Sequence, residues 1–249
     1  MATVAVFNIK GGVGKTATAV NLAWMAWSRG ARVLLWDLDP QGAASWYFRI
    51  GARVKGGGKA LVKGKRELGE AVRGTDYPGL DLVPADFSYR KLDLHLAAHK
   101  KGEKRLARVL APVAAEYDLV ILDCAPSISL LSEAIFRAAD ALLVPTIPTP
   151  LSLRTLEQLE RHLYKHDLDD VELLPFLCMV DRRKRLHRDL CDDEQGAGRF
   201  LETRIPYSSV IEQMGLHRAP VFEYAPRSAA AAAYELLWHE VGDRLQLDE

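Results

Sequence analysis

A glycine-rich loop near the N-terminus has the residue types that bind phosphate. Gly11, Gly12 and Gly14 allow the backbone to approach an anion without a Cβ clash, and their N–H groups would point at it. Lys15 would reach the β- and γ-phosphates of a nucleotide, and the Thr16 hydroxyl would bind Mg²⁺. The predicted nucleotide-binding set in this loop is Gly11, Gly12, Val13, Gly14, Lys15, Thr16 and Ala17.

The loop departs from the general phosphate-binding pattern G-x-x-x-x-G-K-S/T. Ile9 stands where that pattern has its first glycine, and an additional lysine, Lys10, stands at the front of the loop. A strand-like run at residues 4–8 precedes the loop, and a helical pattern at residues 16–28 follows it. This context places an anion at a helix N-terminus, so it favours a phosphate site over a chance glycine-rich turn.

Acidic residues end two further strand-like runs. Asp123 ends the apolar run 119–123, at the point where an open α/β sheet binds its ligands, and its carboxylate would hold Mg²⁺ through water. Asp37 and Asp39 lie at the end of the run 32–37. The alternatives are local roles, in which Asp123 caps the following turn and Asp39 begins a turn over residues 39–42.

The elements that must position these residues alternate along the chain. Further strand-like runs are residues 80–84, 141–145 and 173–180, and further helical patterns are residues 104–117, 127–139, 151–166 and 227–247. Continuous apolar strands indicate burial on both faces. We therefore predict an α/β fold of the P-loop NTPase type, with a doubly wound, mostly parallel sheet and helices on both faces. Residues 1–249 would form a single P-loop ATPase domain, with a mobile, basic, glycine-rich loop at about residues 51–66.

The bulk composition excludes several classes of protein. Basic and acidic residues balance at 33 each, so an anionic partner would need a local basic patch. Cys124, Cys178 and Cys191 are widely spaced, which argues against a cysteine-bound zinc or iron–sulfur centre and fits a reduced compartment. Neither a secretory leader nor a run of about 20 apolar residues is recognisable. We expect a cytoplasmic protein.

Motifs along nearly the whole chain point to one family. Together with the glycine-rich loop, they resemble the ParA/MinD group of deviant-Walker ATPases, and most closely its ParA (Soj-like) branch. The similar segments are residues 33–42, 77–85, 117–127, 179–183, 219–226 and 233–236. The resemblance implies a homodimer that closes around ATP and Mg²⁺ and hydrolyses ATP slowly. It also implies non-specific DNA binding and a ParB-like or cargo-adaptor protein that stimulates hydrolysis.

The resemblance assigns catalytic roles to residues around the loop. Lys10 would cross to the phosphates of the partner subunit, as an arginine finger supplied in trans does; the alternative is a solvated lysine near the nucleotide. Asp39 would orient the attacking water near the metal, and Asp37 would support the metal shell. The predicted catalytic residues are Lys10, Lys15 and Asp39.

The remaining predictions for the nucleotide concern the metal and the base. Thr16, Asp39 and Asp123 are the residues predicted around Mg²⁺, and Asp37 and Asp123 complete the cofactor-binding set. Met179 and Pro206 are candidates for the adenine side by family position alone.

A basic run follows the predicted strand 173–180. It contains Arg182, Arg183, Lys184, Arg185 and Arg188. Such a surface would touch DNA phosphates with salt-dependent affinity, and a solvated helix face is the alternative. The chain departs from the ParA pattern at a later loop, because the arginines that commonly follow Ile-Pro are absent after Ile205-Pro206. Basic residues in the 51–66 segment could compensate.

The resemblance leaves the cargo open. We expect partition of a chromosome, a plasmid or another cargo by a nucleoid-associated protein. The alternatives are the positioning of a protein cargo, such as a microcompartment or a chemosensory cluster, and a nucleotide-switch regulator that does not bind DNA. We expect no membrane attachment, because residues 241–249 are acidic and lack a basic amphipathic pattern.

Overall fold

The chain folds around a sheet in which all but one strand run parallel. The computed structural model describes residues 1–168, 170–191 and 198–247, whose strands are arranged in the order β3-β4-β2-β5-β1-β6-β7-β8. Only β3 pairs antiparallel among these strands. This confirms the predicted mostly parallel sheet. The strands are β1 (Ala2–Val6), β2 (Val33–Asp37), β3 (Arg73–Gly74), β4 (Leu80–Val83), β5 (Leu119–Asp123), β6 (Ala141–Thr146), β7 (Glu172–Val180) and β8 (Arg204–Pro206).

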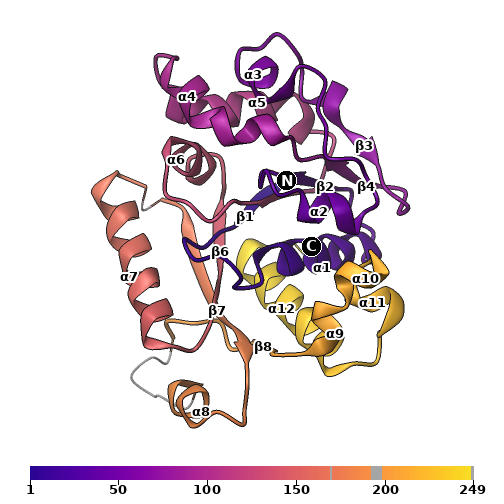
Figure 1. Cartoon of the computed structure of the whole chain (residues 1–249), viewed down its shortest axis with the longest axis vertical. Helices are drawn as coiled ribbons and strands as arrows, with labels where there is room; N and C mark the ends of the chain where they lie inside the picture. Colours follow the sequence, from indigo (N-terminus) through magenta and orange to yellow (C-terminus); the bar gives the residue numbers. More distant parts are fainter. Residues whose placement is uncertain (169, 192–197, 248–249) are drawn as a thin grey trace.

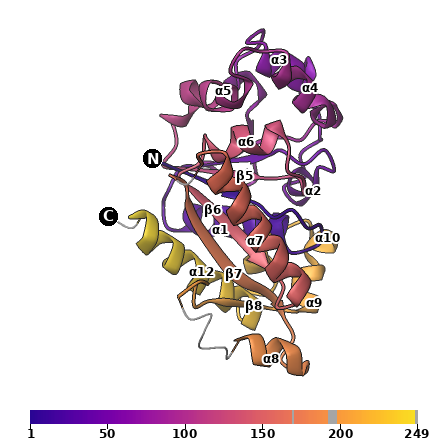
Figure 2. The same ribbon diagram turned by 90° about the vertical axis from the view of Figure 1, so that its left-hand side faces the viewer.

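Helices cover both faces of the sheet, as predicted (Figure 1). One face is covered by α1 (Lys15–Ser28), α2 (Ala43–Tyr47), α9 (Ser209–Glu212), α10 (Met214–His217), α11 (Val221–Tyr224) and α12 (Ala229–Leu245). The other face is covered by α3 (Gly57–Val62), α4 (Leu92–Ala97), α5 (Arg105–Ala114), α6 (Leu130–Phe136) and α7 (Pro150–Lys165), with the 3₁₀ turns η1 (Gly69–Ala71), η2 (Phe87–Lys91) and η3 (Gly102–Lys104). Helix α8 (Arg185–Cys191) lies at one end of the molecule, beyond β7 and β8 (Figure 2).

Two buried cores form because side chains alternate along each strand. In β1, Val4 and Val6 face the core beneath α1 and α12, whereas Ala5 belongs to the opposite core. Phe7, just after the strand, joins that opposite core and packs edge-on against Phe136 of α6. The wholly buried strands β1, β2, β5 and β6 are therefore packed on both sides, which explains their continuous apolar runs in the sequence.

The segment predicted as a loop, residues 51–66, contains a short helix. Helix α3 occupies the centre of this segment, and Leu61 and Val62 are buried in the core beneath α3 to α7. Val54 is buried in the same core. This small apolar stripe holds the segment against the protein, while Lys59 and Lys63 lie on the other side of the helix and are exposed.

The strand register places the carboxyl ends of three central strands next to one another. Val6 and Asp37 are both register partners of Asp123, so β1, β2 and β5 end side by side. From β1 the chain winds toward β4 in one direction, and from β6 it winds toward β8 in the other. The carboxyl end of β1 therefore lies at the topological switch point, where doubly wound sheets bind ligands.

Candidate nucleotide-binding site

The glycine-rich loop leaves β1 at this switch point and enters α1. Gly12 and Gly14 have φ values of +70° and +94°, in the left-handed region that favours glycine. Gly14 is the N-cap of α1, and a Cβ atom built on it would lie 2.9 Å from Sγ of buried Cys178. The loop conformation therefore requires glycine at position 14 for two reasons, namely the backbone angle and the close packing.

Asn8 anchors the start of the loop. Its side chain is buried, and Nδ2 donates to the carbonyl of Pro145 at the end of β6, at 2.9 Å. Its Oδ1 accepts the Lys10 N–H, also at 2.9 Å. Sequence reasoning missed this residue, although an asparagine directly before a glycine-rich loop is a recognisable signal for a local turn bond.

The two lysines of the loop have different environments. Lys15 is buried, and its Nζ donates to the Lys10 carbonyl at 3.1 Å. Burial lowers the pKa of Lys15, and the nearby charge of Asp123 is the largest influence in the opposite direction. Lys10 is half-buried, and its Nζ lies 3.3 Å from Oγ of Ser152 in the first turn of α7. Lys10 thus rests against its own chain, through a contact that the sequence did not reveal.

Asp37 and Asp123 form a buried acidic pair behind the loop. Asp37 Oδ2 accepts the N–H and the hydroxyl of Ser45 at 2.8 and 2.7 Å. Within the described residues, Asp37 Oδ1 and both carboxylate oxygens of Asp123 have no hydrogen-bond partner. Burial raises the pKa of Asp37 to about 6. Burial, and then the charge of Asp37, raise the pKa of Asp123 well above its ordinary value.

These unpartnered oxygens fit a hard cation. Mg²⁺ prefers oxygen ligands and usually keeps several waters, so a carboxylate without protein donors suits it. Thr16 lies close enough to lower the pKa of Asp123, although the two side chains do not meet the geometry of a hydrogen bond. Thr16 and Asp123 would hold the ion, which would neutralise the charge that burial disfavours.

Asp39 forms a local turn and also lies near the two buried aspartates. Its Oδ1 accepts the Gln41 N–H at 2.9 Å, and its carbonyl accepts the Gly42 N–H at 2.9 Å, so the alternative turn is present. Its charge also raises the pKa of Asp37 and Asp123, which shows that it lies near both. The structure therefore brings Asp39 to the loop, and its role toward water stays a prediction.

Met179 and Pro206 lie at the carboxyl ends of the neighbouring strands β7 and β8. Pro206 pairs with Val180, and Met179 has a left-handed φ of +57° beside an irregularity in the β7–β8 register. An adenine contact by either residue stays a prediction. Pro206 also borders a cleft of about 690 Å³, lined by Val180, Arg182, Arg188, Cys191, Arg204, Pro206, Ala229 and Ala233.

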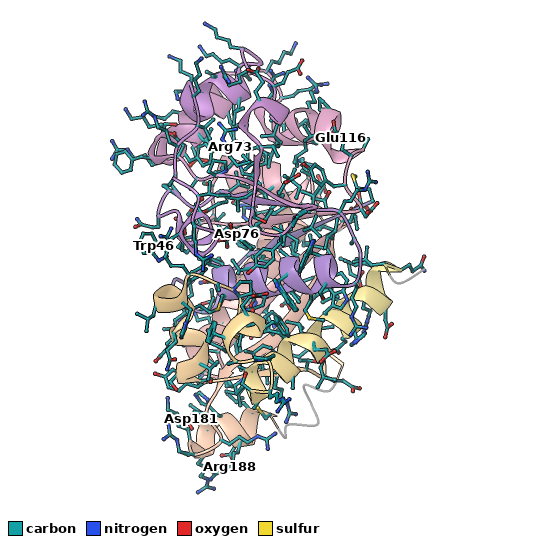
Figure 3. All side chains as sticks on the ribbon, turned by 90° about the vertical axis from the view of Figure 1, so that its right-hand side faces the viewer. Trp46, Arg73, Asp76, Glu116, Asp181 and Arg188 are labelled. Atoms are coloured by element: carbon teal, nitrogen blue, oxygen red, sulfur yellow. The ribbon has the colours of Figure 1, made fainter. Side chains whose placement is uncertain are left out.

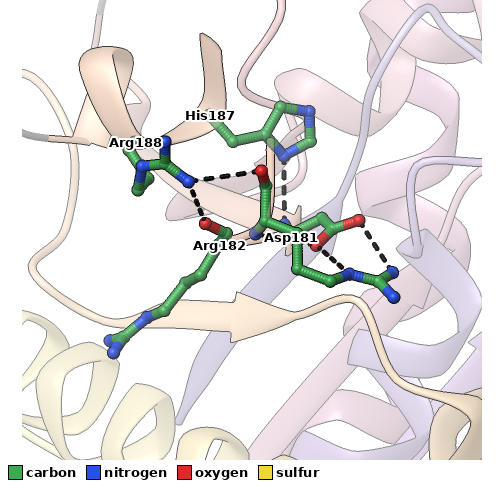
Figure 4. Close-up of polar contacts among 5 residues, drawn as sticks. Asp181, Arg182, His187 and Arg188 are labelled. Atoms are coloured by element: carbon green, nitrogen blue, oxygen red, sulfur yellow. Dashed lines mark hydrogen bonds and ion pairs between the residues drawn. The ribbon is translucent and has the colours of Figure 1, made fainter. Parts of the chain in front are cut away.

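The basic run lies at the end of the molecule that carries α8, far from Arg73 on the β3 edge (Figure 3). Figure 4 shows that several of its charges hold the turn itself together. Arg183 forms a two-pronged ion pair with Asp181 at 2.9 and 3.0 Å. Arg188 donates to the carbonyls of Arg182 and Arg183 at 2.7 and 3.2 Å.

The same run is still strongly exposed. The side chains of Arg183 and Arg185 are 84% and 87% exposed, and Arg182 and Lys184 are exposed as well. Its carbonyl bonds and ion pair order the turn without covering the charged groups. The DNA-binding role of these residues stays a prediction. Over the described part of the chain, none of the helices is both long and apolar enough to span a membrane.

A parallel sheet, a glycine-rich loop with its lysine at the switch point, and a buried acidic pair define a P-loop nucleotide-binding protein. Residues 1–169 match a family described as an AAA domain. The chain is 32% identical over 245 residues to the sporulation initiation inhibitor protein Soj of Bacillus subtilis, covering 96% of this chain and 97% of Soj. It is 32% identical over 250 residues to the chromosome partitioning protein ParA of Caulobacter vibrioides, covering 97% and 94%. The chain therefore belongs to the ParA family of deviant-Walker ATPases.

A solved structure gives the same fold. It is described as cobyrinic acid a,c-diamide synthase from Mycobacterium smegmatis with bound ATP analogue and magnesium. The likeness has a TM-score of 0.84 and 26% sequence identity, and it covers 99% of this chain and 96% of that chain. The fold of this chain therefore occurs in a protein that holds an ATP analogue and magnesium.

Proposed function

We propose that this chain is an ATPase that binds Mg-ATP, closes into a homodimer and partitions or positions a DNA or cellular cargo over the nucleoid. The observation that carries the proposal is the placement of Lys10 at the front of the nucleotide loop, where the Ser152 hydroxyl is the single hydrogen-bond partner of its Nζ among the described residues. Membership of the ParA family supports the same cycle.

Hydrolysis follows from the residues around the loop. The backbone N–H groups of the loop and Lys15 bind the phosphates, and Thr16 and Asp123 would hold Mg²⁺, which would supply positive charge for the phosphate oxygens. Asp39 orients the attacking water and contributes charge, because a carboxylate is a weak base toward water at neutral pH. Asn8 and Ser45 position this machinery by fixing the loop and Asp37.

In the proposed dimer, the Lys10 side chain moves to a second position. A weak contact at 3.3 Å with a neutral hydroxyl is readily exchanged for a charge-assisted contact with the phosphates of a partner subunit. The cation then arrives only when two subunits meet, which makes hydrolysis depend on assembly.

The test is analytical ultracentrifugation with Mg²⁺ and a non-hydrolysable ATP analogue. The wild-type chain should form a dimer, and Lys10→Ala should bind the analogue yet remain monomeric. Ser152→Ala is the matched control, because it removes the contact within the chain and keeps the lysine, so it should dimerise at least as readily. Dimerisation and ATP turnover of Lys10→Ala at wild-type levels would reject the trans role.

Binding to nucleoid DNA is supported by the exposed basic run. Arg182 and Lys184 are exposed in the turn before α8, and Arg185 is exposed at the first residue of α8, where it also pairs with Asp189. Lys59 of α3 and Lys63 directly after it offer a separate basic surface. Each phosphate contact contributes about 0.9 to the slope of log affinity against log salt. A shift assay with ATP over a salt series should give a steep slope for the wild-type chain.

Charge-removing variants locate the DNA surface. Arg182→Gln, Lys184→Gln and Arg185→Gln combined should weaken binding and flatten the salt slope more than Lys59→Gln with Lys63→Gln does. The absence of ATP-dependent DNA binding at low salt would contradict the nucleoid role and favour a switch regulator. A ParB-like or cargo-adaptor protein that accelerates turnover completes the proposed cycle in the cytoplasm.

A further inference from the structure

A cluster of two histidines and a glutamate joins α6 to α7, away from the nucleotide loop. Glu133 Oε1 of α6 lies 3.6 Å from His162 Nε2 and 3.7 Å from His166 Nδ1. The three atoms all lie within 4.8 Å of one another. The two rings stack with centroids 4.3 Å apart.

The distances from Glu133 Oε1 to the two ring nitrogens are close to those of a tetrahedral transition-metal site, and the two nitrogens lie within 4.8 Å of each other. Because imidazole lone pairs lie in the ring plane and the rings are stacked, one ring must rotate for both nitrogens to face the same ion. Ligand atoms about 2.0–2.1 Å from one zinc ion lie about 3.3 Å apart, so the glutamate–imidazole distances need to shorten by only a few tenths of an ångström. Histidines four residues apart project from the same side of a helix, which is the spacing that binds zinc in helical motifs. His162 Nε2 is buried and has no hydrogen-bond partner among the described residues.

The three side chains are accessible from solvent. Burial, and then the charge of His166, lower the pKa of His162. The His162, His166 and Glu133 side chains are 15%, 37% and 24% exposed, so an ion can enter from solvent. Arg137 of α6 donates to the His166 carbonyl at 3.1 Å and already fixes the end of α7. The charge of Glu133 raises the pKa of His162, and the charge of Lys165 lowers it more weakly than burial and His166 do.

We propose that Glu133, His162 and His166 form a zinc site that clips α6 to the C-terminal end of α7. Two imidazole nitrogens and one carboxylate select zinc or a similar transition ion over Mg²⁺, and a water would fill the fourth position. The site uses no cysteine, so it is independent of the argument from cysteine spacing. It is also independent of ATP binding and hydrolysis.

The test is calorimetric titration of zinc chloride into the chelator-treated full chain, with excess Mg²⁺ to occupy the carboxylates at the nucleotide loop. The wild-type chain should bind one tight zinc ion, and its Tm should rise. Glu133→Gln and His162→Gln should each weaken this binding at least about tenfold. His239→Gln, an exposed histidine on α12, is the matched control and should bind as the wild type does.

Two further measurements separate metal binding from a folding defect. Circular dichroism and Tm without zinc should show that the glutamine variants fold, and their ATP affinity should equal that of the wild type. Ring ¹⁵N shifts should change on zinc addition only for His162 and His166. The absence of tight zinc binding by the wild-type chain, or wild-type affinity in the folded variants, would overturn the proposal.

Discussion

Asp37→Asn should stabilise the nucleotide-free protein in a pH-dependent way. In the folded chain, burial raises the pKa of Asp37 from 3.8 to about 6. Ionisation of this buried side chain therefore costs stability, because the folded state holds the proton more tightly than the unfolded state does. An asparagine keeps an oxygen for both Ser45 bonds, and its amide group replaces the oxygen that has no partner.

The magnitude follows from the two pKa values. The stability that the protonated form provides is fully present below the unfolded pKa of 3.8 and is lost as the pH rises through about 6. The loss is about 1 kcal/mol at about pH 4.5 and about 3 kcal/mol at about pH 8, using about 1.36 kcal/mol for each tenfold change. The advantage of Asp37→Asn over the wild type should therefore grow by about 2 kcal/mol between these pH values.

Urea unfolding with a chelator and without nucleotide measures this difference. Asp189→Asn, on exposed α8, is the matched control, and its effect should be nearly the same at both pH values. An effect of Asp37→Asn that is equal at both pH values, or a loss of stability at about pH 8, would refute the argument. The variant should also gain less stability from Mg-ATP, because the lost charge is the one proposed to support the metal.

Other variants test the loop, the metal and the basic turn. Gly14→Ala should lower the free energy of unfolding by more than the 1–2 kcal/mol or so expected from φ alone, and by more than Gly30→Ala, because Gly30 has a similar φ of +96° and no atom within 4 Å of its built Cβ. Equal losses in urea unfolding would contradict the packing argument. Asp123→Asn should keep the fold but lose at least about tenfold in Mg²⁺-dependent ATP affinity, measured by competition with a fluorescent analogue; unchanged Mg²⁺ dependence would oppose its metal role. Arg188→Ala should cost about 1 kcal/mol, whereas exposed Arg185→Ala should cost less than about 0.5 kcal/mol, and equal costs would argue against Arg188 as the group that orders the turn.

The order of residues along the chain was sufficient to predict the central part of the fold. A strand, a glycine-rich turn and a helix follow one another within 28 residues, so their geometry is local. Continuous apolar runs indicated strands buried on both sides, and Asp37 and Asp123 were placed at strand ends. Both residues were predicted at the nucleotide site, Asp37 from the family resemblance, and their register pairing brings them together.

Contacts between distant segments were not predictable in this way. Helix α3 was missed because it is only six residues long and begins with two glycines, and burial of Leu61 and Val62 beneath neighbouring helices makes it favourable. The Lys10–Ser152 contact spans 142 residues of sequence, and no pattern around either residue indicates it. The zinc cluster likewise needs Glu133, which belongs to another helix than the two histidines.

The sequence alone thus determined which residues can bind phosphate and metal, because backbone freedom at glycine, charge on lysine and oxygen on aspartate are properties of the residues and their spacing. Only the tertiary structure decided how those groups are held before a ligand arrives. Among the described residues, the buried carboxylate of Asp123 has no hydrogen-bond partner, and burial raises the pKa of Asp37. Sγ of Cys178 leaves no room for a Cβ atom at Gly14, and the Ser152 hydroxyl contacts Lys10 Nζ. These effects arise from packing between segments that are distant in the chain, where low polarity makes each unpaired charge costly.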